Sequence, residues 1–201
     1  MAEDCQKVID PRIRRTRQLL QKALESLLET MEFENISVQD ITDAATVNRA
    51  TFYDHYTDKF ALLECMVGTR FHELLAAREV EFGGGCSSAL RAIVLGVCDY
   101  LVEMPGMGRT RQRQLEPHLE SAVIAMVRRM LLEGMVRHPP ENGVSPEMMA
   151  TTLSWAIYGA SKEWMQTPNR CRSEEIVDTV MMLVAPIMDS KPISAPTTAI
   201  S

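Results

Sequence analysis

Apolar positions recur at helical spacing through most of the chain, and the most informative pattern lies between Ser37 and Lys59. Ser37 is followed three residues later by Asp40, an arrangement typical of a capped helix start. Behind this start the apolar residues follow a helical period for about two turns, as Val38, Ile41 and Ala45. The pattern therefore predicts a short helix.

A second short helix is predicted directly afterwards. Thr46 and Val47 interrupt the apolar pattern, and Asn48 can cap a helix that carries a set of polar side chains, namely Arg49, Thr51, Tyr53, His55 and Tyr56. Two short helices across a tight corner form a helix-turn-helix, in which the second helix enters the major groove of DNA.

The chemistry of the second helix supports contact with DNA. At helical spacing, Arg49, Tyr53 and Tyr56 share one stripe, and Asn48, Thr51 and His55 share the neighbouring stripe. Hydroxyl groups bond phosphate oxygens, arginine or asparagine can pair with base edges, and Lys59 adds a cation just past the helix. The alternative is that Tyr53 and Tyr56 are core aromatics of a small helical domain. Phe52 falls between the two stripes, so spacing alone does not decide whether it is buried.

The rest of the chain is predicted to be helical as well, which makes the fold class all-α. Helices are expected over residues 11–31, 59–80, 87–104, 117–137, 145–165 and 173–188. Gly83–Gly85 is the clearest break in the pattern. Residues 107–115 are either a loop or a short helix whose arginines form a solvated face. Residues 1–10 are expected to be a loose arm, and residues 190–201 a disordered tail.

The segment from about Arg17 to Leu63, the first third of the chain, resembles the DNA-binding domain of TetR-family transcriptional regulators. Several spaced positions agree together: Leu19, Leu20, Ala23, Leu24, Leu27, Leu28, Ser37, Val38, Ile41, Thr42, Val47, Phe52, Tyr53, Tyr56 and Lys59. The resemblance implies a three-helix DNA-binding domain over residues 11–59. A connecting helix would join it to a helical ligand-binding and dimerisation domain over residues 60–189.

Three positions depart from the family pattern, because Glu32, Thr46 and Ala50 stand where the family often has glycine. A left-handed conformation at position 32 or 46 would be strained without glycine, so either turn is expected to close by another geometry. The DNA-binding residues that pattern and resemblance together indicate are Arg14, Ser37, Asn48, Arg49, Thr51, Tyr53, His55, Tyr56 and Lys59.

Charge and composition limit the interpretation that the first domain binds DNA, but they do not contradict it. The net charge of −6 argues against a general polyanion binder. Even residues 11–59 hold seven cations against eight carboxylates, although four of the cations are clustered arginines between Arg12 and Arg17. These arginines lie either along a phosphate backbone or on a solvated helix start. No apolar run approaches a membrane span, and Met1 to Asp10 reads as neither signal peptide nor anchor, so we expect a cytoplasmic protein.

No pattern for an enzyme or a bound metal stands out. The five cysteines are scattered without a C-x-x-C, which suits reduced thiols. The four histidines are dispersed, and Gly83–Gly85 lacks the Lys-Ser/Thr of a phosphate-binding loop. We therefore expect no catalytic residues, no metal and no cofactor.

Fourteen methionines are many for a chain of this length. Flexible thioethers suit cavities that accept varied apolar molecules, and TetR-like regulators usually have such a pocket in the second domain. The candidate lining residues are Cys98, Met104, Met126, Met130, Trp155 and Tyr158. Plain core filling is the alternative for each of them, because a stripe at helical spacing looks the same in both cases.

The last two helices, about residues 145–165 and 173–188, are apolar on more than one face and need partners on both sides. The resemblance implies that they form a four-helix homodimer interface, which suits two recognition helices on a two-fold operator. A monomer with both helices internal is the alternative. The expected function is a ligand-responsive DNA-binding regulator, a repressor in the favoured version, released by a small apolar molecule. The competing interpretation is an all-helical dimeric interaction module that does not bind DNA.

Overall fold

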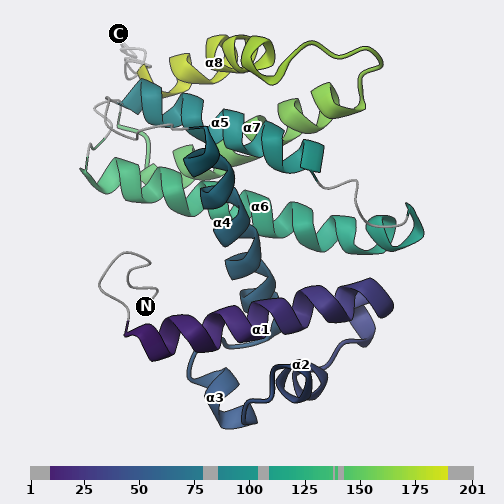
Figure 1. Ribbon diagram of the computed structural model, residues 1–201. Helices are drawn as coiled ribbons and strands as arrows, with labels where there is room; N and C mark the ends of the chain where they lie inside the picture. Colours follow the sequence, from purple (N-terminus) through teal and green to yellow (C-terminus); the bar gives the residue numbers. More distant parts are fainter. Residues whose placement is uncertain (1–9, 79–85, 104–108, 138, 140–142, 190–201) are drawn as a thin grey trace, which may run out of the picture. The chain divides into compact units, whose positions relative to one another are not determined.

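The computed structural model describes residues 10–78, 86–103, 109–137, 139 and 143–189. Every regular element in these ranges is a helix, which confirms the all-α prediction (Figure 1). The chain divides into two compact units, one of residues 1–69 and 105–122 and the other of residues 70–104 and 123–201. The helices α4 (Lys59–Ala77) and α6 (Arg109–Arg137) each contribute residues to both units.

The first unit is built on α1 (Pro11–Thr30), whose amphipathic sequence buries one side. Asp10 caps this helix by accepting a hydrogen bond from the Arg12 N–H at 2.9 Å. After the short 3-10 helix η1 (Phe33–Asn35), α2 (Val38–Ala45) packs on α1, and α3 (Arg49–Tyr53) follows on the same side of α1 (Figure 1). Fully buried apolar side chains from these elements and from α4 form the core of the unit, namely Leu20, Leu24, Ile36, Ile41, Phe52 and Leu62.

The second unit holds α5 (Cys86–Glu103), the later part of α6, α7 (Pro146–Gln166) and α8 (Ser173–Asp189). The helices α5, α7 and α8 pack against one another in all three pairings. Gly96 on α5 allows a close approach to α4, because a Cβ at this position would lie 2.5 Å from the ring of Phe71. The Arg91–Asp178 ion pair, at 2.6 Å, adds a polar link between α5 and α8.

Most predicted helices are confirmed, including the Ser145 cap of α7 and the two turns of α2. Two predictions are wrong. The helix expected from Pro117 starts at Arg109, so Pro117 lies inside α6. The second short helix ends at Tyr53, because the backbone leaves the helix after its cap at Asp54, and His55 and Tyr56 lie beyond it.

The predicted domain limits can be set beside this division. The structure divides the chain within α4 after Thr69, ten residues after the expected limit at Lys59, and assigns residues 105–122 to the first unit. Of the arm expected at residues 1–10, the structure describes only Asp10, which caps α1. Residues 1–9, the Gly83–Gly85 break and the tail at residues 190–201 lie outside the described residues.

Candidate nucleic-acid interface

The start of α2 is fixed by a reciprocal cap. The Ser37 hydroxyl accepts from the Asp40 N–H at 3.2 Å, and the Asp40 carboxylate accepts from the Ser37 N–H at 2.8 Å. The same hydroxyl donates to the Asp40 carboxylate at 2.6 Å. These bonds to Ser37 hold the pKa of the Asp40 carboxyl below its ordinary value. Ser37, a predicted DNA contact, therefore has its hydroxyl engaged in the helix cap.

The corner between α2 and α3 closes through a left-handed residue. Thr46 has φ 56° and ψ 44°, and the Val47 N–H donates to the Thr42 carbonyl at 3.0 Å. The expectation that this turn would avoid the left-handed geometry is wrong, since the hydrogen bonds that end α2 fix it despite the threonine side chain. At Glu32 the backbone is extended, with φ −74°, so no glycine is needed there.

The second short helix, α3, starts at a side-chain cap and presents a small exposed surface. The Asn48 side-chain oxygen accepts from the Ala50 N–H at 2.9 Å, so this oxygen is engaged in the cap. Phe52 is fully buried, which settles the position that spacing left open. Arg49, Ala50 and Tyr53 are exposed, and Thr51 is half-buried.

Tyr53 and Tyr56 differ in how far they are exposed to solvent. Tyr53 is 48% exposed, whereas Tyr56 is 6% exposed and its hydroxyl lies 3.5 Å from the Cys65 Sγ on α4. The assignment of Tyr56 to an exposed stripe with Arg49 is thereby corrected, because that stripe required α3 to continue past Tyr53. Tyr56 is therefore a core aromatic residue, as the alternative interpretation of the sequence proposed.

Lys59 is likewise occupied within the fold. Its ammonium group donates to the carbonyls of Phe33, Glu34 and Ile36 at 2.8, 3.0 and 2.9 Å, and it lies 4.7 Å from the centre of the Phe33 ring. The lysine thus caps η1 from the start of α4, which corrects its expected role as a free cation beside the helix.

Arg49 and Tyr53 form a pair on the exposed side of α3. The Arg49 Nη2 donates to the Tyr53 hydroxyl at 3.2 Å, and the guanidinium carbon lies 5.6 Å from the centre of the Tyr53 ring. Cation–π attraction and the hydrogen bond both hold the guanidinium against the phenol. The two side chains that share the predicted stripe and lie on α3 are therefore in direct contact.

His55 lies at the edge of this surface, half-buried beyond the end of α3. Burial and the nearby Arg17 cation lower its pKa, and Asp54 partly opposes them. The histidine is therefore neutral near neutral pH and can offer one donor and one acceptor.

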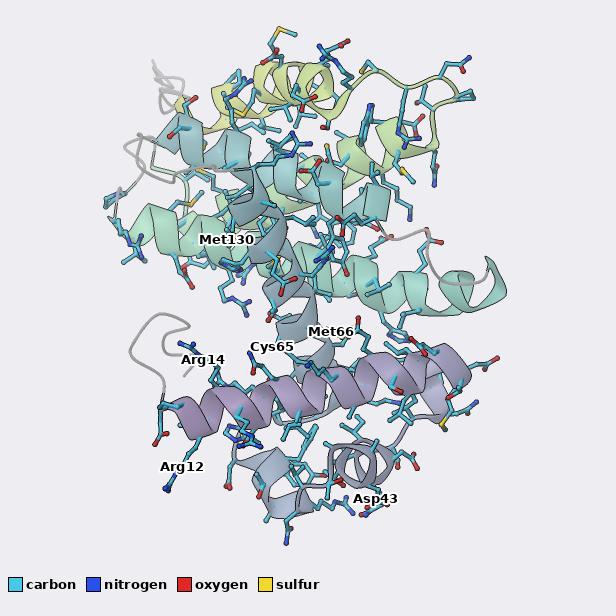
Figure 2. The ribbon with its side chains drawn as sticks, in the orientation of Figure 1. Arg12, Arg14, Asp43, Cys65, Met66 and Met130 are labelled. Atoms are coloured by element: carbon cyan, nitrogen blue, oxygen red, sulfur yellow. The ribbon has the colours of Figure 1, made fainter. Side chains whose placement is uncertain are left out.

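The arginines of α1 point in different directions. Figure 2 shows Arg12 projecting from the side of α1 on which α3 lies, whereas Arg14 projects from the opposite side. Helical geometry explains the split, because residues two apart differ by about 200° around an α-helix. Arg15, three residues after Arg12, lies on nearly the same face as Arg12 and is exposed. The predicted contact Arg14 is thus less well placed than Arg12, and the helical period alone could have indicated this.

Carboxylates outnumber cations in the segment that contains α2 and α3. Residues 31–58 contain Arg49 as their one arginine or lysine, against six carboxylates. One of these, Asp43, lies on the side of α2 that faces away from α1 (Figure 2), and it accepts from the Gln39 side-chain amide at 2.7 Å. Any electrostatic attraction of this segment to DNA would therefore depend on Arg49 and on the nearby arginines of α1.

The predicted ligand-binding residues are only partly brought together in the second unit. Cys98, Met126 and Tyr158 are buried, and Met130 is half-buried. Trp155 is 56% exposed and lies outside that interior, and Met104 lies outside the described residues. Burial raises the pKa of the Cys98 thiol to about 11, and the thiol lies 3.5 Å from the Ser161 hydroxyl.

An open pocket of about 510 Å³ lies elsewhere in the second unit, and none of those ligand-binding candidates lines it. Its polar wall is an ion-pair cluster that sequence analysis did not identify. Arg78 bonds Asp99 at 2.6 Å and also pairs with Glu174. These partners raise the pKa of Arg78, and burial raises that of Asp99. Partners so distant in sequence give no local signal.

The described residues hold neither a candidate metal site nor a helix suited to span a membrane. No grouping of three histidine, cysteine or acidic side chains there could hold a metal ion. None of the helices in the described ranges combines the length and apolar character needed to cross a membrane.

The two short helices α2 and α3, joined by the left-handed corner at Thr46, have the arrangement of a helix-turn-helix. A family model described as "Bacterial regulatory proteins, tetR family" matches residues 20–66, the stretch that contains η1, α2 and α3. Residues 20–66 therefore match the DNA-binding region of the TetR family of transcriptional regulators.

A curated relative shares this region. The chain is 44% identical over 71 residues to the uncharacterized HTH-type transcriptional regulator YxbF of Bacillus subtilis (strain 168). The match covers 35% of this chain and 19% of the relative, so the chain spans about a fifth of the length of the curated relative it matches.

Solved structures of regulators are also similar to this chain. A TetR transcriptional regulator from Streptococcus agalactiae 2603V is 21% identical with a TM-score of 0.46, and the match covers 88% of this chain and 97% of that one. NalD of Pseudomonas aeruginosa, titled the secondary repressor of an efflux pump, is 16% identical with a TM-score of 0.46, covering 89% and 98%.

Proposed function

We propose that this protein is a dimeric, ligand-responsive regulator that binds a two-fold symmetric DNA operator through α3. The observation that carries the proposal is the exposed Arg49–Tyr53 pair on a short helix whose opposite side is anchored by the buried Phe52. Contact with the major groove requires polar side chains that are exposed on the second helix of a helix-turn-helix. The Arg49–Tyr53 pair on the short helix α3 meets this requirement. An interaction module would not need it.

The DNA step is tested with a duplex from upstream of the protein's own gene, at low salt and without added ligand. Arg49→Ala and Tyr53→Ala should weaken binding. Arg137→Ala, which removes an exposed arginine from the end of α6, is the charge-matched control and should behave like the parent. If the parent does not bind the duplex, and Arg49→Ala and Tyr53→Ala behave like the parent, the result favours an interaction module that does not bind DNA.

The dimer is proposed to form through α7 and α8. Large apolar side chains remain exposed on both helices, among them Met148, Trp155 (56%), Met182 (72%) and Leu183. On α7 the exposed residues Met148, Thr152, Trp155 and Gly159 recur at helical spacing and form one face. A contiguous exposed apolar face of this kind favours a partner, and a second copy supplies the matching face by two-fold symmetry.

Light scattering on a sizing column tests this interface. Trp155→Glu and Met182→Glu should convert the dimer to a monomer. Val136→Glu is the control, because Val136 is 80% exposed but lies on α6, and this variant should remain dimeric. A parent that elutes as a monomer, or charged variants that leave the mass unchanged, would contradict the proposed face.

The response to a ligand is the third part of the proposal, with repression as its sign. A small apolar molecule that binds the second unit more tightly in a DNA-free conformation would shift the population away from DNA. A thermal-shift screen of hydrophobic compounds identifies candidates, and release from DNA then tests the coupling. A compound that raises the melting temperature yet leaves DNA affinity unchanged would refute this step. Repression predicts that the protein lowers transcription from a promoter that contains its operator.

A further inference from the structure

We propose that each reading unit selects its half-site mainly through one guanine, which Arg49 recognises, with Tyr53 as the residue that positions the guanidinium. This inference rests on the proposed DNA-binding function and specifies the base that the site recognises. It follows from which polar groups of the helix-turn-helix are already engaged and which are not.

Elimination within the structure leaves few groups that can read bases. His55 can offer a donor and an acceptor, but it is half-buried beyond the end of α3, whereas Arg49 is exposed on the first turn of α3. The Ser37 hydroxyl and the Asn48 oxygen are engaged in helix caps, and the Lys59 ammonium bonds three carbonyls of the η1 region. Reading adenine with asparagine requires the amide oxygen and nitrogen together, so a capping Asn48 is poorly suited to it. Thr51 is half-buried, and a hydroxyl pairs with several bases without distinguishing them.

Arg49 has the complementary properties. It is exposed at the first position of α3, where residues of a recognition helix meet base edges. A guanidinium has five N–H donors, of which the Tyr53 hydroxyl accepts one from Nη2. The remaining donors can form a parallel pair with O6 and N7 of guanine, whereas adenine places a donor at the position of O6.

Tyr53 makes this recognition more selective by limiting where the guanidinium can go. The ring beneath it at 5.6 Å and the 3.2 Å hydrogen bond restrict a side chain that would otherwise sample many rotamers. Restricting these rotamers in the free protein lowers the entropy lost on binding. The contact acts through Arg49 and need not touch a base.

The acidic surroundings concentrate selectivity on this residue. Six carboxylates lie within residues 31–58, so attraction of this segment to DNA of any sequence is weak. A site with little general attraction depends more heavily on the one group that pairs with a base edge.

The test begins with selection of bound duplexes from a random pool by the full-length protein. Each guanine of the selected half-site is then replaced by 7-deazaguanine, which lacks the N7 acceptor. We expect one position per half-site where this replacement weakens binding by about tenfold or more. Arg49→Ala removes the donors and should bind selected and random duplexes alike. Arg49→Lys keeps the charge but loses the planar fork of donors, so it should keep the salt dependence and lose part of the preference. Tyr53→Phe should keep its affinity for random duplex and lose part of the preference.

The outcomes separate this inference from the proposed function. Enrichment of a sequence whose affinity is insensitive to every 7-deazaguanine replacement would overturn the guanine assignment while leaving DNA binding intact. An Arg49→Ala variant with the full preference of the parent would also overturn it, because Arg49 would then contribute nothing to the choice of base. A Tyr53→Phe variant indistinguishable from the parent would overturn the positioning role. Failure to bind or enrich any duplex at low salt would instead count against the proposed function itself.

Discussion

Thr46 occupies the left-handed corner of the helix-turn-helix, and replacing it with glycine should stabilise the protein. The left-handed conformation costs an L-residue roughly 1–2 kcal/mol, and a β-branched side chain is among the least suited to it. Thr46 adopts it with φ 56° and ψ 44°. Glycine avoids this cost but loses about 0.5–1 kcal/mol more conformational entropy on folding.

The net effect of Thr46→Gly is therefore a gain of about 0.5–1 kcal/mol in the free energy of unfolding. The substitution keeps the backbone hydrogen bonds to Thr42 and Asp43 that end α2. The threonine side chain is exposed, so its removal exposes no core. For a chain of about this size, the melting temperature should rise by roughly 1–4 °C.

Thermal and urea unfolding of three variants test the reasoning. Thr46→Ala keeps the Cβ and should gain little, because most of the steric cost remains. Among the described residues, Asn169 is the other non-glycine residue with positive φ, at 54°. Asn169→Gly should gain less stability than Thr46→Gly because asparagine tolerates this region better. A Thr46→Gly protein no more stable than the parent, or a Thr46→Ala protein with the same gain, would refute the strain at this corner.

Two further predictions concern the second unit. Gly96→Ala should destabilise the protein by about 1–2 kcal/mol, because crowding the buried Phe71 ring, 2.5 Å away, exceeds the gain of about 1 kcal/mol in helix propensity. Gly134→Ala, with open space around its Cβ, should show that gain alone, and equal unfolding free energies for the two would contradict the close helix approach. Cys171 is exposed, whereas burial raises the pKa of Cys98 to about 11, so iodoacetamide at pH 8 should label Cys171 well before Cys98. Mass spectrometry of the peptides reads this out, and equal native rates would show that Cys98 is accessible.

The sequence predicted the helices of this protein far better than it predicted the roles of their polar residues. A capping box such as that of Ser37 is local, so three neighbouring residues suffice to place a helix start. The sequence does not show the full extent of α6, because proline is typical of a helix start and Pro117 lies inside a helix that begins at Arg109.

The candidate site was harder to predict because engagement of a polar group is not local. Lys59 finds its carbonyl partners 23 to 26 residues earlier in the chain, and spacing gives no indication of them. On a continuous helix, Tyr53 and Tyr56 would share one stripe. Because α3 ends at Tyr53, the two side chains instead lie in different environments. The Arg49–Tyr53 contact was implied by spacing, since four residues within a helix bring two side chains together.

The small number of available cations links the two proposed surfaces. Lys59 is engaged in a cap, and Arg14 is directed away from the side of α3. In the proposed complex, Arg49 and the neighbouring arginines of α1 would therefore supply most of the attraction to DNA in each copy. One copy with so few cations is expected to bind DNA weakly. When a dimer holds two half-sites together, the binding free energy roughly doubles, so the affinity rises far more than twofold. A substitution at Trp155 should therefore weaken operator binding although it changes no residue of the helix-turn-helix. Exposed apolar side chains on α7 and α8 are thus as necessary to the proposed activity as the arginine on α3.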